Sequence, residues 1–181
     1  MLVKKSKTNM LTYPLYIGKL VIHLHSLETV LRTCLLVNDI GDKKSIEITT
    51  KYHNLVLGQE VDDDAFTNYD QLKCLIKKYN EMVSLYSLKK LKIDDYHDLV
   101  NLRDAIAHGR AFYQEVSPPY TTMILLKFSN PKKTGKTKVV YMEVMNNDWL
   151  EDKINLVLKE YNKVVKAYNR IKKSNLNKTN K

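Results

Sequence analysis

The chain has 181 residues, 44% of them hydrophobic, which is enough to form one domain with a buried core. Its formal net charge of +10 favours an anionic partner, such as nucleic acid or an acidic protein. The two cysteines belong to no CxxC motif or Cys/His cluster, which argues against a zinc site and indicates two reduced core thiols in a cytoplasmic protein. No run approaches the roughly 20 apolar residues of a membrane span, so we expect no association with a membrane.

The first predicted helix runs from about Leu15 to Asn38 and is stopped by Gly41. Its apolar residues recur at alternating intervals of three and four, which is typical of one buried helical stripe. They are Ile17, Leu20, Leu24, Leu27, Leu31 and Cys34. Residues 1–12 are expected to form an N-terminal arm, and residues 41–61 an irregular segment with a short β-rich stretch at 46–50.

The second predicted helix covers about 64–89. Asp62 is its expected N-cap, because a carboxylate there can accept hydrogen bonds from the first free amides. Lys89 and Lys90 suit its negative C-terminal end. The apolar stripe consists of Tyr69, Leu72, Ile76, Tyr79, Val83 and Tyr86.

The third predicted helix starts at Asp94 as N-cap and runs through His108. Gly109 is expected to end it in the left-handed conformation. With residues placed at about 100° intervals, Leu99, Leu102 and Ile106 mark the core face. A polar stripe elsewhere on the helix contains His97, Asn101, Asp104 and His108.

Two predicted strands follow, at 121–129 and 137–145, with a turn containing Pro131 and Gly135 between them. They predict a β-hairpin at about 121–145. Residues 127–138 hold five lysines and no acid, so the positive charge gathers around the turn. Such a concentration suits contacts with phosphates.

The last predicted helix starts at Asp148 as N-cap, with Glu151 completing a capping box. It has the most regular heptad pattern in the chain, which is typical of a bundle or a dimer seam. The seam residues are Leu150, Ile154, Val157, Tyr161, Val164, Tyr168 and Ile171. Residues 172–181 are expected to be a basic, frayed tail.

Together these elements predict a mostly α fold, a four-to-five-helix bundle with an inserted β-hairpin at about 121–145, within a single domain over 1–181.

Arg103, Asp104 and His108 on the third helix are the candidate functional residues. His108 lies in the last helical turn, whose negative end favours the imidazolium form. Asp104 lies four residues earlier, where its carboxylate could orient the ring, and Arg103 offers a planar fork of donors for a phosphate. The sequence has no glycine-rich phosphate loop and no GxSxG elbow, so we expect no cofactor. These groups suit metal-independent cleavage of RNA, in which the 2′-hydroxyl attacks the adjacent phosphorus.

The same spacing also has a purely structural interpretation. His108 would then be a cationic cap at the end of an ordinary helix, and Arg103 a surface ion-pair partner.

Residues 103–109, Arg-Asp-Ala-Ile-Ala-His-Gly, resemble the R-x4-6-H signature of HEPN domains. The resemblance implies an all-α bundle, in which the hairpin would be an insertion, and a metal-independent endoribonuclease of toxin–antitoxin, abortive-infection or antiviral defence systems. It further implies a homodimer with both motifs in one cleft, an antitoxin or defence-system partner protein, and Arg103 and His108 as the catalytic pair with Asp104 supporting. The HEPN toxins paired with nucleotidyltransferase antitoxins usually show H-x-Y, and Arg110 stands here in place of that tyrosine.

Two other functions remain open on the sequence. One is a non-catalytic HEPN-like module that binds RNA or nucleotide or serves as a protein partner. The other is a basic helical interaction protein in which the motif occurs by chance.

Overall fold

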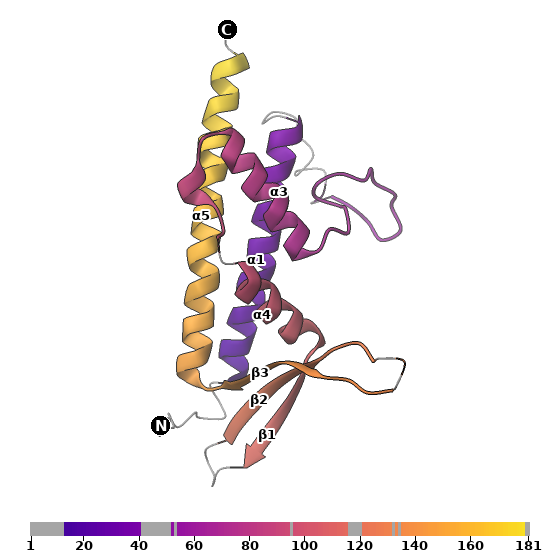
Figure 1. Ribbon diagram of the computed structural model, residues 1–181. Coiled ribbons are helices and arrows are strands. Elements are labelled where there is room, and N and C mark those ends of the chain that lie inside the picture. Colours follow the sequence, from indigo (N-terminus) through magenta and orange to yellow (C-terminus); the bar gives the residue numbers. More distant parts are fainter. Residues whose placement is uncertain are drawn as a thin grey trace. The chain divides into compact units, whose positions relative to one another are not determined.

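The computed structural model describes residues 13–40, 52, 54–94, 96–115, 121–131, 133 and 135–179 (Figure 1). These residues are mostly helical and include a small three-stranded antiparallel sheet, which confirms a mostly α fold class. The expected arm at 1–12, the stop at Gly41 and the β-rich stretch at 46–50 lie outside the described residues.

The chain divides into two compact units, one of residues 1–24 and 97–158 and the other of residues 25–96 and 159–181. Helices α1 (Tyr13–Ile40) and α5 (Asn147–Thr179) each contribute to both. The two units share the helices α1 and α5, so this division does not by itself decide the number of domains. The expected single domain therefore stays a prediction.

The sheet of the first unit consists of β1 (Arg110–Glu115), β2 (Thr121–Phe128) and β3 (Val139–Met145), in that order. The antiparallel pairing of β2 and β3 confirms the predicted hairpin. The sequence reading missed β1, because only Gly109 separates it from the preceding helix and no turn residues announce it.

Helix α4 (Tyr96–His108) ends where the sequence predicted. Leu99, Leu102 and Ala105 are fully buried, whereas Ile106, which was expected in the core, is half-buried. The buried stripe therefore continues through Ala105. Residue 95 is not described, so the expected N-cap at Asp94 stays a prediction.

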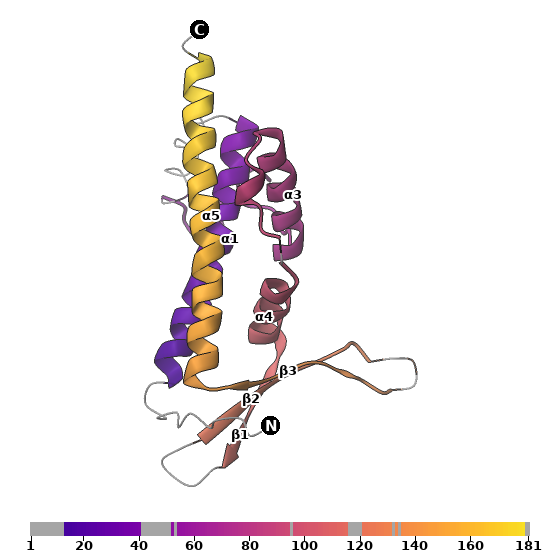
Figure 2. The ribbon, with the colours of Figure 1, turned by 60° about the vertical axis from the view of Figure 1, so that its left-hand side comes forward.

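One face of the sheet belongs to the core of this unit. Met123, Leu125 and Met145 are buried there. The Tyr13 hydroxyl donates a hydrogen bond of 2.8 Å to the Met145 carbonyl, which ties the start of α1 to the end of β3. Figures 1 and 2 both show the first turns of α1 and α5 beside this end of the sheet.

The N-cap of α5 is Asn146 and not Asp148 as expected. Asn146 Oδ1 accepts a hydrogen bond of 2.7 Å from the Trp149 amide, which is the cap geometry. The expected capping box does not form, because Glu151 instead accepts a hydrogen bond of 2.7 Å from the Tyr16 hydroxyl. The helix continues to Thr179, through most of the segment expected to be a frayed tail.

The second unit contains α3 (Leu72–Leu85) and a short 3-10 helix, η1 (Lys89–Leu91). The prediction of a helix over 64–89 was too long at both ends, and the expected N-cap at Asp62 is wrong, because α3 starts directly after Gln71. Asp64 does not lead into a helix, because its Oδ1 accepts hydrogen bonds from the Phe66 and Thr67 amides in a local turn. Tyr69, expected in the core stripe, is consequently fully exposed. At the other end, Lys89 and Lys90 lie in η1 beyond the end of α3.

Helix α1 is long and apolar enough to cross a membrane by length and composition alone, contrary to the sequence expectation that no segment is. The same features are typical of the core helix of a globular protein. Most of its predicted stripe is buried inside the protein, namely Leu20, Leu24, Leu27, Leu31 and Cys34.

The buried stripe of α5 departs from the predicted heptad seam. Tyr161 and Tyr168 are half-buried, and their preceding neighbours Glu160 and Ala167 are buried instead. Val164 and Ile171 are buried as predicted, and the buried face also takes in the residues four positions before them, which lie on the same side of the helix. Lys163 Nζ lies 2.9 Å from Glu160 Oε2 and partners this buried carboxylate.

Candidate functional site

Helix α4 passes into β1 through Gly109 alone, directly after the motif. The expected left-handed glycine stop is wrong, since the φ of Gly109 lies outside the left-handed region. The position needs a glycine because neighbouring backbone atoms leave no room for a side chain. A Cβ at this position would clash with the Ala105 carbonyl oxygen and lie 2.9 Å from that of Leu126. The close approach packs the end of α4 against β2.

Asp104 connects the motif helix to the sheet. Its Oδ2 accepts a hydrogen bond of 3.0 Å from Lys127 Nζ on β2, and its Oδ1 lies 3.4 Å from Arg103 Nη1. All three side chains are partly buried. One carboxylate thus holds two cations, and this cluster of Arg103, Asp104 and Lys127 carries a net positive charge.

Sequence reasoning missed Lys127 as a site residue. It was noted only as the first lysine of the basic segment 127–138. Its position on β2 could have identified it. Odd-numbered residues of this strand, such as Met123 and Leu125, face the core side, and Lys127 is one of them. A lysine in that register needs an anionic partner, and Asp104 supplies it.

His108 is exposed at the last turn of α4. Within the described part of the chain it makes no hydrogen bond or ion pair, so the expected bond from Asp104 to the ring is absent there. His108 shares a helix face with Asp104 four residues earlier, whereas Arg103 lies roughly 140° around the axis from His108. The structure therefore brings Asp104 and Arg103 together and leaves the histidine ring to the solvent.

Tyr141 on β3 is the cross-strand neighbour of Lys127. Burial, together with the nearby carboxylates of Glu143 and Asp98, raises the pKa of its phenol to about 12. At neutral pH the phenol therefore stays protonated and can donate a hydrogen bond.

Among the described residues, no group of three or more His, Cys, Asp and Glu side chains is placed to hold a metal ion. To an anionic ligand the site offers hydrogen-bond donors and positive charge. Arg103 and Lys127 are the fixed cations, and His108 is a titratable group that a ligand can reach from solvent.

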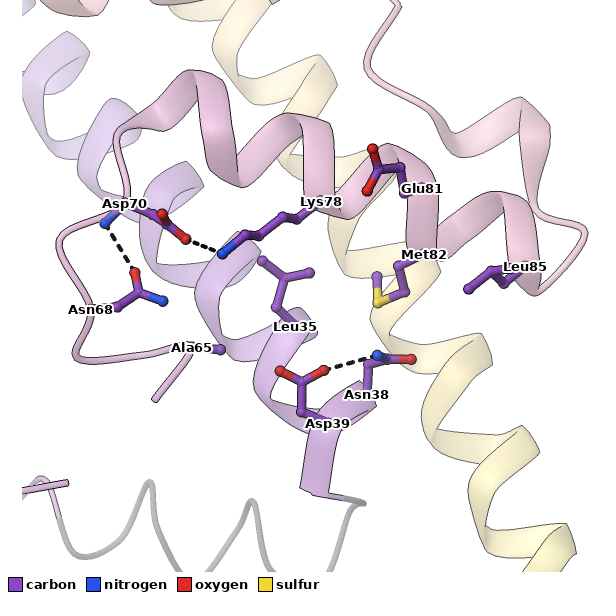
Figure 3. Close-up of a pocket in the computed structure, with 10 residues that line it drawn as sticks. All are labelled: Leu35, Asn38, Asp39, Ala65, Asn68, Asp70, Lys78, Glu81, Met82 and Leu85. Atoms are coloured by element: carbon purple, nitrogen blue, oxygen red, sulfur yellow. Dashed lines mark hydrogen bonds and ion pairs between the residues drawn. The ribbon is translucent and has the colours of Figure 1, made fainter. Parts of the chain in front are cut away.

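A separate cavity of about 350 Å³ lies in the second unit, between the end of α1, residues 65–70 and α3 (Figure 3). Lys78 Nζ pairs with Asp70 Oδ2 at 2.5 Å on its rim, and Asp39 and Glu81 add further carboxylates. Its acidic lining does not suit a phosphate, and it contains none of the motif residues.

No family model, curated protein or solved structure matches this chain. The resemblance to HEPN domains therefore stays a prediction, and residues 103–109 are its only specific part.

Proposed function

We propose that the protein is a cytoplasmic, metal-independent endoribonuclease of HEPN type, built on a HEPN-like helical bundle, with Arg103 and His108 as catalytic residues. The single observation that best supports this function is the exposed imidazole of His108 at the C-terminal end of α4, five residues after a partly buried arginine. The ring is open to solvent there, so a substrate can reach it for proton transfer. The net charge of +10 suits an RNA substrate.

In the proposed reaction the ribose 2′-oxygen bonds to phosphorus while the bond to the 5′-oxygen breaks. The products are a 2′,3′-cyclic phosphate and a 5′-hydroxyl end. An imidazole accepts the 2′-hydroxyl proton, and an imidazolium donates a proton to the leaving oxygen. Arg103, supported by Lys127, stabilises the charge on the phosphoryl oxygens. The supporting role of Asp104 would be to position these two cations rather than to orient the histidine.

One histidine cannot readily act on both sides of a phosphate at once. A homodimer with a two-fold axis beside the motif would supply two histidines to one cleft. We propose this arrangement together with a role as a toxin or abortive-infection effector, held in check by an antitoxin or another defence-system protein.

A non-catalytic HEPN-like module that binds RNA or nucleotide or a partner protein is the second candidate, and the contacts of Asp104 favour it. Lys127 and Arg103 occupy the carboxylate, and within the described residues nothing orients the His108 ring. A phosphate could then bind at the two cations without being cleaved.

Labelled RNA incubated with the protein in excess chelator separates the two candidates. The endoribonuclease cleaves it, and Arg103→Ala and His108→Ala both abolish cleavage. His97→Ala is the matched control, because His97 is an exposed histidine of the same helix. RNA binding without cleavage would support the second candidate and overturn the first.

A further inference from the structure

The sheet has an apolar face that is open to solvent, opposite the face that carries Met123, Leu125 and Met145. The exposed fractions of Phe112, Val140, Met142 and Val144 on this face lie between 48% and 66%. The pairing continues the apolar surface across the strands, with Phe112 opposite Ile124, Ile124 opposite Val144 and Leu126 opposite Met142. A sheet face left to water normally carries polar residues, so an apolar one marks an interaction surface.

Positive charge lies at the end of this apolar face where β2 leads into β3. Arg110 lies over the Phe128 ring, with its guanidinium carbon 5.7 Å from the ring centre. Lys133, Lys136 and Lys138 are exposed in the connection between β2 and β3. No acidic residue occurs from 127 to 142. A partner that matches this surface presents apolar side chains flanked by carboxylates.

The chain itself carries such a segment, at residues 55–63. Leu55, Val56 and Leu57 are exposed, and the exposed acids Glu60, Asp62 and Asp63 follow within six residues of Leu57. Gly58 adopts a φ of +86°, and the Gln59 amide donates a hydrogen bond of 3.1 Å to the Val56 carbonyl. This turn separates the apolar tip from the acids that follow it, and we call residues 55–63 the acidic loop.

We propose that the acidic loop of one copy docks on the open sheet face of a second copy, and that the reverse contact forms at the same time. The leucines and valine of the loop would cover Phe112, Met142 and Val144, while its carboxylates meet the lysines of the β2–β3 connection. The exposed side chains of this face are mainly aliphatic, which suits a protein partner better than stacked nucleic-acid bases.

This contact does not depend on RNA cleavage. It uses the sheet face opposite Lys127, so the cluster of Arg103, Asp104 and Lys127 stays uncovered. Assembly is measured by analytical ultracentrifugation and activity by RNA cleavage. A dimer without cleavage overturns the endoribonuclease alone, a dimer that tolerates the changed loop and sheet face overturns this contact alone, and a monomeric chain overturns both.

A charge-swap experiment tests the docking. One variant carries Lys133→Glu, Lys136→Glu and Lys138→Glu, and a second carries Glu60→Lys, Asp62→Lys and Asp63→Lys. Each variant alone should dimerise at least about tenfold more weakly than the unaltered chain, because like charges then face each other. A mixture of the two restores both contacts and should recover a heterodimer. Lys89→Glu with Lys90→Glu is the control, since these exposed lysines lie outside both surfaces.

Met142→Glu tests the apolar part of the contact. This side chain is 66% exposed, so the variant should keep its circular dichroism and thermal melting while losing the dimer. The proposal is overturned if the unaltered chain is monomeric at high concentration. It is equally overturned if the dimer tolerates Met142→Glu and both charge variants, or if RNA or anionic vesicles protect the face of a chain that remains monomeric.

Discussion

Lys127 on β2 donates a hydrogen bond of 3.0 Å to Asp104 on α4, and this contact ties the motif helix to the sheet. The two residues are 23 positions apart in the sequence. Because Arg103 contacts the same carboxylate, Asp104 fixes two cations about one helical turn before the exposed histidine of the motif.

Replacing Lys127 should weaken RNA binding more than it destabilises the fold. Lys127→Ala should lower the free energy of unfolding by about 1 kcal/mol or less, because a partly exposed ion pair contributes little. RNA binding should weaken more clearly, and the slope of log binding constant against log salt should decrease by about 1, the value for one lost phosphate contact. Urea unfolding and salt titrations of RNA binding measure the two effects. An unchanged salt slope would remove Lys127 from the proposed site.

Gly109 should not tolerate a side chain. Gly109→Ala places a Cβ against the backbone oxygens of Ala105 and Leu126, so we expect a loss of about 1–3 kcal/mol in unfolding free energy. Gly18→Ala is the matched control. The helical Gly18 has nothing within 4 Å of the added Cβ, and the change should stabilise the protein by about 0.5–1 kcal/mol. Equal effects of the two substitutions on chemical denaturation would contradict the crowding at Gly109.

Asn146 should matter more than Asp148 for the stability of α5. Asn146→Ala removes the acceptor of the Trp149 amide and should cost about 1 kcal/mol. Asp148→Ala removes only a favourable charge from the first turn, so its cost should be smaller. Thermal unfolding of both variants decides between the two caps, and a larger loss at Asp148 would restore the sequence prediction.

The two cysteines should differ in reactivity. Burial raises the pKa of the Cys34 thiol from 9.0 to about 12, whereas Cys74, which was also expected in the core, is exposed. An alkylating reagent at pH 8 should therefore modify Cys74 in the native protein and Cys34 only after unfolding. Because the folded pKa is the higher one, the thiol contribution to stability is complete below about pH 9 and is lost as the pH rises towards 12. Mass spectrometry of the alkylated peptides checks the difference, and rapid native labelling of Cys34 would contradict its burial.

Local patterns predicted the helical elements well where burial follows a simple period. The buried residues Leu20, Leu24, Leu27 and Leu31 of α1 were all expected from their spacing, and α4 ends at His108 as predicted. The predicted start of the second helix was wrong, because Asp64 accepts hydrogen bonds from the Phe66 and Thr67 amides and forms a local turn instead. The charge pattern of the sequence does not reveal this turn.

The site could be predicted only in part. Arg103, Asp104 and His108 were selected from their spacing on one helix, which is a local property. Lys127 depends on the pairing register of a sheet, and β1 of that sheet was not recognised. The partners of Asp104 therefore could not be derived from periodicity. A bond from Asp104 to His108 was expected because Lys127 was not recognised as a partner of this carboxylate.

The chemistry of the cleaved ends tests the proposed endoribonuclease most directly. A 5′-labelled RNA is incubated with the protein in excess chelator, and the new 3′ ends are analysed by mass spectrometry. We predict 2′,3′-cyclic phosphate ends, which His108→Ala abolishes and His97→Ala leaves intact. Intact RNA, or cleavage that persists at the same rate in His108→Ala, would contradict the account.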